Sequence, residues 1–355
     1  MTALKAYFKR FEKKTHTLQI RLESANPKTA FSYSDTLEDK PFHSASVGKV
    51  FASALIMMAI ESKNLRLDTK VADILDDKLL DRLFVYKGKD YKDEVTLEHL
   101  LGHTSGVNDY FEGKVKGTKP FMEKVLLERD HQFTPYELLD FTRDFQEAVG
   151  RPGEKFVYSD TGYVLLGLVL ETMHEKPYAK ILREKIFTPL GLEDTLLAFY
   201  DERFDATKIA PIHFKGHEMS QAKSLSCDHA GGGIITTTKD LARFLGGLFE
   251  GELIDQDSLR TMMRPRHRFH GIMRYGLGMV EVKLHRVVPW KVGYPTLYGG
   301  LGSLSVHAFY DPLNKEAYII NLGDPALMRR SFMALTRLMT HAKKERQTAR
   351  HKPQS

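Results

Sequence analysis

The chain has 355 residues, 42% of them hydrophobic and 28% charged, a composition typical of a soluble globular protein with a large core. This length predicts one large domain or two subdomains. The single cysteine, Cys227, excludes an internal disulfide and fits a reducing compartment. No His- or Asn-bearing motif points to Cys227, so a structural thiol is favoured over a catalytic one.

The net charge of +6 is concentrated at the two ends of the chain. Residues 1–15 hold five Lys or Arg and one Glu, and residues 341–355 hold the same numbers, so the body between them carries −2. Because no basic stripe with interleaved aromatics runs through the body, the sequence argues against nucleic-acid binding. Residues 344–355 are predicted to form a basic, disordered tail.

The N-terminal segment predicts an amphipathic helix. Leu4, Tyr7, Phe8 and Phe11 recur at helical spacing among lysines and arginines. Such a helix can lie on a membrane surface, but packing against the protein's own sheet is the favoured interpretation. Residues 1–14 contain no signal-peptide core, and no stretch of the chain reaches transmembrane length. We therefore expect a cytoplasmic protein, unless an export signal has been trimmed.

A predicted hairpin precedes a predicted buried helix. Apolar and polar residues alternate over Thr17–Glu23, and Thr29–Tyr33 can return as the second strand. Val50–Ile60 is almost wholly apolar and contains no Pro or Gly, which indicates a helix buried in the core.

The sequence Ser46-Val-Gly-Lys49 lies at the start of this helix. Residues three apart share a helix face, so Lys49 Nζ can reach Ser46 Oγ, and the helix N-terminus adds positive potential at the hydroxyl. An alcohol in this setting can become a nucleophile. The alternative is an N-cap serine followed by a solvated lysine, which the four residues alone would favour.

The rest of the chain divides into a helical region and a strand-rich region. Helical patterns begin at Thr96 and recur at 121–129, 134–147, 160–174 and 177–187. From Gly231 the pattern changes to a strand, a helix and further strands, and a helix at about Pro325–Lys343 closes the chain. The candidate strands in this last part are 276–283, 286–292, 303–311 and 317–322.

This order of elements predicts an α/β (α+β) fold. An antiparallel sheet flanked by N- and C-terminal helices would be formed by residues 1–64 and 230–343, with 65–229 as a mostly helical insertion. The helix that begins near Ser46 would lie at the seam between the two parts, where ligand clefts usually form.

A second polar motif runs from Arg151 to Tyr163. Pro152-Gly153 indicates a turn, and Tyr158 precedes a helix that Asp160 or Thr161 would cap. Taken alone, Tyr158 is best interpreted as a packing residue. With a lysine nearby, its phenol could be held partly ionised and act as a general base.

A third motif, Tyr298-Gly-Gly-Leu-Gly-Ser303, precedes a predicted strand. Its small residues, including Gly300 and Gly302, would let a ligand approach the strand edge. The N–H group of Ser303 could then join that of Ser46 in an oxyanion hole. A glycine-rich hairpin turn is the alternative.

Together these motifs resemble the serine hydrolases of the superfamily of class C β-lactamases, D-Ala-D-Ala carboxypeptidases and carboxylesterases. The resemblance covers roughly residues 1–340 and implies the β-lactamase/transpeptidase-like fold. Beyond the motifs already described, it rests on four further segments, which occur in the expected order: Leu100–Gly106, Pro152–Gly167, Phe187–Leu192 and Ala230–Leu245.

The resemblance also implies a role for each site residue. Ser46 would attack a carbonyl, Lys49 would accept or relay its proton, and Tyr158 would act as base and then as acid toward the leaving group. The backbone N–H groups of Ser46 and Ser303 would hold the oxyanion. No metal or organic cofactor is implied.

Two positions depart from the family pattern. Asp160 stands where the family usually has the Asn of Tyr-x-Asn, and an ionised carboxylate there would raise the pKa of Lys49 and oppose its use as a neutral base. Gly300-Leu-Gly302 stands where the family has Lys-Thr-Gly or His-x-Gly, so the cation that binds a substrate carboxylate is missing. The candidates to replace it are Lys291, Arg274 and His307.

We predict a serine hydrolase that acts through an acyl-enzyme on an ester or amide of a small molecule or peptide. Asp160, Gly300 and Gly302 are the predicted substrate-binding positions. β-Lactams and peptides ending in D-alanine carry a free carboxylate, so both departures disfavour them, whereas neutral esters are penalised less. The alternative is a catalytically weakened ligand-binding or regulatory protein on the same fold.

Overall fold

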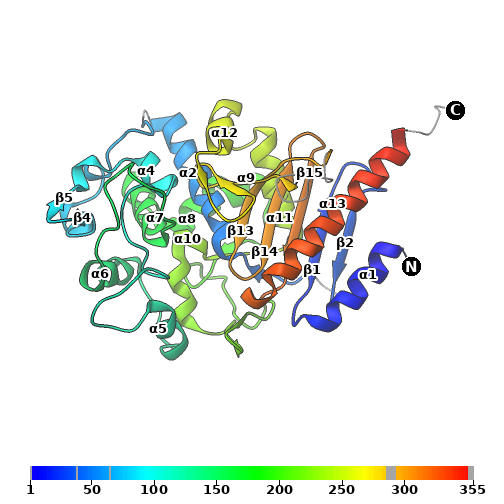
Figure 1. Cartoon of the computed structure of the whole chain (residues 1–355), viewed down its shortest axis with the longest axis horizontal. Helices are drawn as coiled ribbons and strands as arrows, with labels where there is room; N and C mark the ends of the chain where they lie inside the picture. The colour runs from blue at the N-terminus through cyan, green and yellow to red at the C-terminus, as the bar shows by residue number, and fades with distance from the viewer. Residues whose placement is uncertain (1, 37–38, 64, 285–292, 351–355) are drawn as a thin grey trace.

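A computed structural model describes residues 2–36, 39–63, 65–284 and 293–350. Its main sheet has eight antiparallel strands, and the N-terminal strand β1 pairs with β15 near the end of the chain (Figure 1). The strands lie in the order β10 (His267–Arg268), β11 (Met273–Tyr275), β12 (Val280–Val282), β13 (Leu297–Gly302), β14 (Val306–Asp311), β15 (Glu316–Asn321), β1 (Gln19–Glu23) and β2 (Phe31–Ser34).

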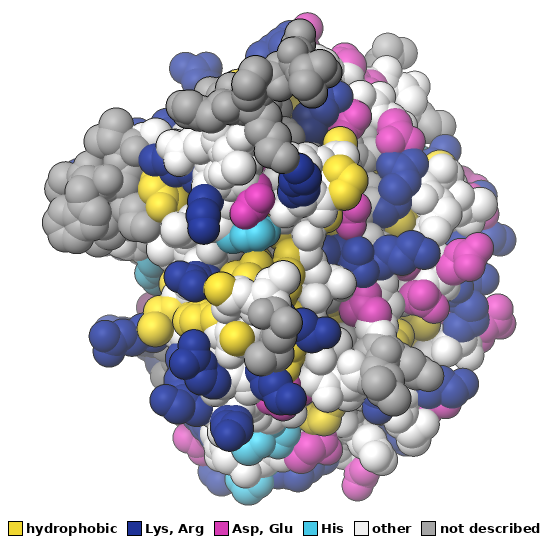
Figure 2. Space-filling model, turned by 90° about the vertical axis from the view of Figure 1, so that its right-hand side faces the viewer, with side chains coloured by type: hydrophobic (Ala, Val, Ile, Leu, Met, Phe, Trp, Pro, Cys, Tyr) yellow, Lys and Arg dark blue, Asp and Glu magenta, His cyan; other side chains and the backbone are white. Residues whose placement is uncertain are grey.

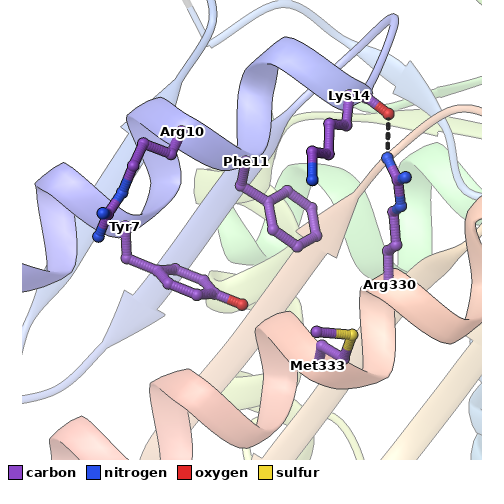
Figure 3. A pocket seen from close by; sticks show the side chains of 6 residues that line it. All are labelled: Tyr7, Arg10, Phe11, Lys14, Arg330 and Met333. Carbon is purple, nitrogen blue, oxygen red and sulfur yellow. Dashed lines mark hydrogen bonds between the residues drawn. The ribbon is translucent and has the colours of Figure 1, made fainter.

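The two terminal helices cover one face of this sheet. Leu4 and Phe8 of α1 (Ala3–Phe11) and Leu335 of α13 (Met328–Arg350) are buried against strand residues such as Ile320. Figure 2 shows the outside of this layer, and Figure 3 shows side chains of both helices facing one another. The burial of Leu4 and Phe8 confirms that the N-terminal helix packs on the sheet.

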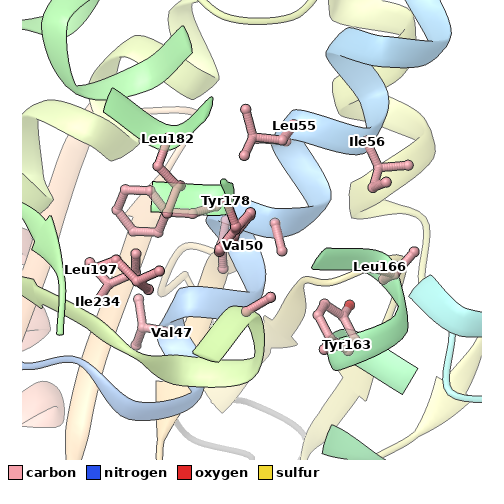
Figure 4. Close-up of a cluster of buried hydrophobic side chains, with 14 of the residues drawn as sticks. Val47, Val50, Leu55, Ile56, Tyr163, Leu166, Tyr178, Leu182, Leu197 and Ile234 are labelled. Atoms are coloured by element: carbon pink, nitrogen blue, oxygen red, sulfur yellow. The ribbon is translucent and has the colours of Figure 1, made fainter. Parts of the chain in front are cut away.

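Helix α2 (Gly48–Lys63) and α11 (Thr238–Glu250) lie on the other face, in a second core with buried sheet residues such as Ile319. Side chains of α2 meet those of α7 (Asp160–His174), α8 (Tyr178–Leu182), β6 (Leu196–Leu197) and β9 (Ile234–Thr236) in this core (Figure 4). Gly48 allows a close approach, because a Cβ there would lie 2.9 Å from Gly232 Cα.

One helical stretch among the described residues, Ala45–Ser62, is long and apolar enough to cross a membrane by length and composition. The prediction that no stretch reaches this length is therefore wrong by that criterion. However, 72% of the stretch is buried inside the protein, as the sequence predicted for a core helix.

Among the regular elements described between α2 and β9, helices hold far more residues than strands, as predicted. Thr134 caps α6 in a capping box with Glu137, and Ser159 caps α7, one residue before the predicted cap. The helices are α3 (Asp77–Leu80), α4 (Leu97–Leu101), α5 (Phe121–Leu127), α6 (Pro135–Phe145), α7 (Asp160–His174), α8 (Tyr178–Leu182), α9 (Thr188–Leu190) and α10 (His229–Gly232), and α12 (Gln256–Met263) follows α11.

The strands of this region are two or three residues long. Four of them pair as two separate hairpins. The others belong to a three-stranded sheet, which joins this region to the segment before α2. They are β4 (Val85–Tyr86) with β5 (Lys89–Asp90), β7 (His213–Phe214) with β8 (His217–Glu218), and β3 (Phe42–His43), β9 (Ile234–Thr236) and β6 (Leu196–Leu197).

Two of the element boundaries predicted from the sequence need correction, and one predicted strand lies outside the residues that the structure describes. The glycine-rich motif forms strand β13 itself, and Ser303 lies in the turn after it instead of starting the next strand. Helix α13 continues to Arg350, so the predicted tail is helical from residue 344 to 350. The candidate strand at 286–292 lies outside the described residues.

Candidate active site

Ser46 lies in a single 3₁₀ turn, Ala45–Val47, directly before α2. The residue before it, Ala45, has a φ of 48°, a left-handed conformation that is costly for a residue with a Cβ. The N–H group of Ala45 donates to Nδ1 of the buried His43 at 3.1 Å, which helps to hold this conformation. The strained turn therefore presents the half-buried Ser46 at a fixed position.

Lys49 lies one turn further, only 1% exposed, and donates to three groups. Its Nζ contacts Ser46 Oγ at 3.3 Å and the carbonyl of Gly231 at 2.7 Å, and it forms an ion pair with the Asp160 carboxylate. Burial lowers the pKa of Lys49, but the neighbouring Asp160 outweighs burial, so the pKa is raised above the ordinary value. The predicted contact with Ser46 is confirmed, and Lys49 is an ammonium in the free protein.

Tyr158 faces the same lysine, with Lys49 Nζ 4.8 Å from its ring centroid. Burial raises the pKa of this phenol, and the charge of Lys49 offsets only part of that effect. The phenol is therefore neutral at neutral pH, and the prediction of a partly ionised Tyr158 is wrong for the free protein.

His103 fixes the backbone on either side of Tyr158 through hydrogen bonds with Val157 and Ser159. Its carbonyl accepts the N–H of Val157 at 2.9 Å, its Nδ1 accepts the N–H of Ser159 at 3.1 Å, and its ring lies 4.2 Å from the Tyr158 ring. Burial keeps the pKa of His103 well below its usual range, so the imidazole is neutral. The motif Leu100–Gly106 thus positions the tyrosine.

Two further carboxyls stand beside Asp160. Asp109 accepts the backbone N–H groups of Phe111, Glu112 and Asp160, and burial together with the charge of Asp160 raises its pKa to about 7. The same two causes raise the pKa of Asp228 to about 7. Asp228 keeps 23% of its side chain exposed and lies 3.5 Å from Nε2 of His43.

These groups meet in a cavity of about 290 Å³. Ser46, Tyr158 and Asp160 line it, together with Ser303, the second predicted oxyanion donor. Among the described residues no Lys or Arg lines this cavity, whereas four carboxyl side chains do: Asp109, Glu112, Asp160 and Asp228. Its remaining side chains include Phe111, Phe269, His270, Leu301 and Met328.

Gly300 and Gly302, predicted as substrate-binding positions, are not among the residues that line this cavity, and both are closely packed. A Cβ on Gly300 would lie 3.0 Å from Val47 Cα, and a Cβ on Gly302 would lie 2.5 Å from the Ser44 carbonyl oxygen. Strand residues alternate between two sides, and it is Leu301 and Ser303 that line the cavity. The glycines let β13 lie directly against the turn that carries Ser46.

The candidate replacements for the missing cation do not line this cavity. His307 is buried in β14 and bonds to Ser331 Oγ at 2.7 Å, and Arg274 lies in β11. Lys291 lies outside the described residues. Instead, the exposed His270 reaches the cavity from the turn between β10 and β11.

Asp109 and Asp228 were not identified from the sequence as residues of the site, because neither belongs to a recognised motif. Asp109 follows the Leu100–Gly106 segment by three residues, and Asp228 precedes the Ala230–Leu245 segment by two. Proximity to a recognised segment was thus the available signal, and only the fold shows that both carboxyls turn toward Ser46.

Solved structures of other proteins share this fold. The D-amino acid amidase from Ochrobactrum anthropi SV3 matches with a TM-score of 0.77, at 21% identity, over 95% of this chain and 99% of that chain. EstCE1, a hydrolase with promiscuous acyltransferase activity, matches with a TM-score of 0.73, at 16% identity, over 96% of both chains. The predicted β-lactamase/transpeptidase-like fold is confirmed.

The family follows from the sequence as a whole. Residues 23–339 match the family model described as Beta-lactamase, so the chain belongs to the Beta-lactamase family. The predicted resemblance to this family is confirmed, and the curated relatives of the chain include penicillin-binding proteins and putative D-alanyl-D-alanine carboxypeptidases.

Curated relatives match over part of their length. Penicillin-binding protein 4* of Bacillus subtilis (strain 168) is 26% identical over 292 residues, which are 75% of this chain and 60% of the relative. A putative D-alanyl-D-alanine carboxypeptidase of Escherichia coli (strain K12) is 34% identical over 204 residues, 49% of this chain and 46% of the relative. The chain therefore spans less than two thirds of the length of these relatives.

Proposed function

We propose that this protein hydrolyses esters or amides whose acyl part is neutral or carries an ammonium group, through an acyl-enzyme at Ser46. The observation that carries the proposal is the direct contact of Lys49 Nζ with Ser46 Oγ at 3.3 Å, beside a cavity lined by carboxyls. A serine whose hydroxyl meets a proton-transfer group and an open cavity is set up for nucleophilic attack.

The Lys49–Asp160 ion pair determines how the proton leaves Ser46. Because Lys49 is already an ammonium, it can take the proton of Ser46 only as it passes one of its own to Asp160. The pair then acts as one base. In this mechanism Asp160 does not hinder catalysis by keeping Lys49 charged. It is the final acceptor of the proton that leaves Ser46.

Tyr158 and two backbone groups complete the reaction. The neutral phenol of Tyr158 is in the protonation state needed to donate a proton to the leaving group. The N–H groups of Ser46 and Ser303 would stabilise the oxyanion that forms when Ser46 attacks the carbonyl. Water then hydrolyses the acyl-enzyme and restores the free serine.

The charge of the cavity selects the substrate. Four carboxyls line it, and its lining holds no Lys or Arg among the described residues. Because the pKa values of Asp109 and Asp228 are raised to about 7, these two are partly protonated at neutral pH, and the repulsion of a substrate carboxylate grows as the pH rises above that value. This disfavours β-lactams and peptides that end in a free D-alanine. An ammonium group can be neutralised by the same carboxyls, and the printed name of the amidase neighbour, D-amino acid amidase, fits such a substrate.

A series of matched esters tests this proposal. The p-nitrophenyl esters of β-alanine, butanoic acid and succinic acid have acyl chains of similar length that end in an ammonium, a methyl and a carboxylate. We expect hydrolysis of the first two and slow hydrolysis of the third, with all three rates lost in Ser46→Ala. Fastest hydrolysis of the succinate ester would refute the charge argument.

The second candidate function is a ligand-binding protein with weakened chemistry. The raised pKa of Lys49 favours it, since an ammonium alone cannot act as a base. Binding of the β-alanine ester or its amide without turnover, at equal affinity in wild type and Ser46→Ala, would support this candidate against the hydrolase.

A further inference from the structure

A groove runs along the outer surface between α1 and α13. Its floor is formed by the rings of Tyr7 and Phe11 and by Met333, a residue that is 53% exposed (Figure 3). This part of the groove has a volume of about 360 Å³. It adjoins a second hollow of about 570 Å³, which shares Tyr7 and Met333.

Basic side chains surround this apolar floor. Arg10, Lys14 and Arg330 form the rim, and Arg330 also bonds to the Lys14 carbonyl at 2.5 Å (Figure 3). Arg329 and Arg337 line the adjoining hollow. In Figure 2, hydrophobic side chains on this face lie among the side chains of Lys and Arg.

The two segments that form this face together carry more positive charge than the whole chain. Residues 3–14 hold five Lys or Arg against Glu12, and residues 328–340 hold three Arg and no acid, which together give +7. The whole chain carries +6, so the remaining residues carry −1. The carboxylate of Glu12 accepts the hydroxyl of Tyr33, which directs it toward the sheet.

Helix α1 uses only part of its apolar surface for the fold. Leu4 and Phe8 are buried against the sheet, whereas Tyr7 and Phe11 are half-buried and turn toward the groove. The helix thus has apolar groups in the core, apolar groups at the surface, and five cations beside them. A surface of this kind suits an anionic interface better than a second copy of the chain, whose own groove has the same positive charge.

We propose that the face formed by α1 and the first half of α13 docks on the surface of a membrane rich in anionic phospholipids. The lysines and arginines would meet the lipid phosphates, while Tyr7, Phe11 and Met333 would enter the interface between headgroups and acyl chains. Docking here would hold the protein at the membrane through residues other than Ser46, Lys49 and Tyr158.

Vesicle flotation of the full chain tests this proposal. We expect binding to phosphatidylcholine vesicles that contain phosphatidylglycerol, loss of binding at high salt, and no binding to pure phosphatidylcholine. The Arg10→Gln/Lys14→Gln variant should bind more weakly, by about fivefold for each charge removed. Met333→Ser should also weaken binding without changing ester hydrolysis.

A matched control separates this face from general charge attraction. The Lys114→Gln/Lys119→Gln variant removes two exposed lysines from a loop in the helical region, and it should bind vesicles as wild type does. Equal losses in both double variants would overturn the proposal, as would the absence of binding to the anionic vesicles. Retention of soluble duplex DNA without vesicle binding would replace it with a nucleic-acid surface.

Discussion

Replacing Asp160 with Asn tests the proton path at the centre of the proposed mechanism. The substitution keeps the shape of the side chain and restores the residue that the family usually has, but it removes the carboxylate that pairs with Lys49. Lys49 would keep its contacts with Gly231 at 2.7 Å and Ser46 at 3.3 Å, so the site should remain assembled. If the ion pair is the base, acylation should slow by about 10²–10⁴-fold, which is about 3–5 kcal/mol in the barrier.

The pH profile of this variant gives a second readout. Without Asp160, burial is left as the larger influence on Lys49, so its pKa should fall below that of the wild type. Residual acylation should then rise with pH as Lys49 becomes neutral and can act alone. Stopped-flow acylation with p-nitrophenyl butanoate, from about pH 6 to about pH 10, measures both effects. Faster acylation than wild type at neutral pH would refute the relay and show that Asp160 inhibits Lys49.

Three other substitutions follow from the geometry. Gly302→Ala should destabilise the protein by about 1–3 kcal/mol or prevent folding, because the new Cβ would lie 2.5 Å from the Ser44 carbonyl oxygen. The control Gly246→Ala places its Cβ in open space on α11, so the thermal midpoint of unfolding should change little. His103→Phe should preserve packing but remove the acceptor for the Ser159 N–H, and should lower kcat about tenfold at unchanged KM. An equal fall in kcat/KM for all substrates with unchanged kcat would contradict a positioning role.

The sequence predicted those parts of the fold that depend on local patterns. The apolar run from Val50 and the spacing of Ser46 and Lys49 were enough to predict the buried helix and the contact at its start, because helix geometry fixes residues three apart. The start of α7 was predicted to within one residue from the polar residues that precede it. Ser159 acts as its cap because its hydroxyl accepts the N–H of Gly162.

Contacts between distant segments could not be predicted in this way. The glycines of β13 were predicted to form a turn or an edge that faces a ligand. Their packing role depends on how closely the turn at Ser46 approaches that strand, which the sequence alone does not show. The carboxyls of the cavity, Asp109, Glu112, Asp160 and Asp228, lie on three separate segments. The pKa of Tyr158 depends on burial, which its own sequence motif does not encode.

The most direct test of the account is covalent labelling of Ser46. Intact mass measurement after treatment with a fluorophosphonate should show one adduct on the wild type and none on Ser46→Ala. Lys49→Ala should fold and label about 10²–10⁴-fold more slowly. Peptide mapping should place the adduct on Ser46. Absence of any adduct on the wild type, or equal labelling of Ser46→Ala, would contradict the assignment of Ser46 as the nucleophile.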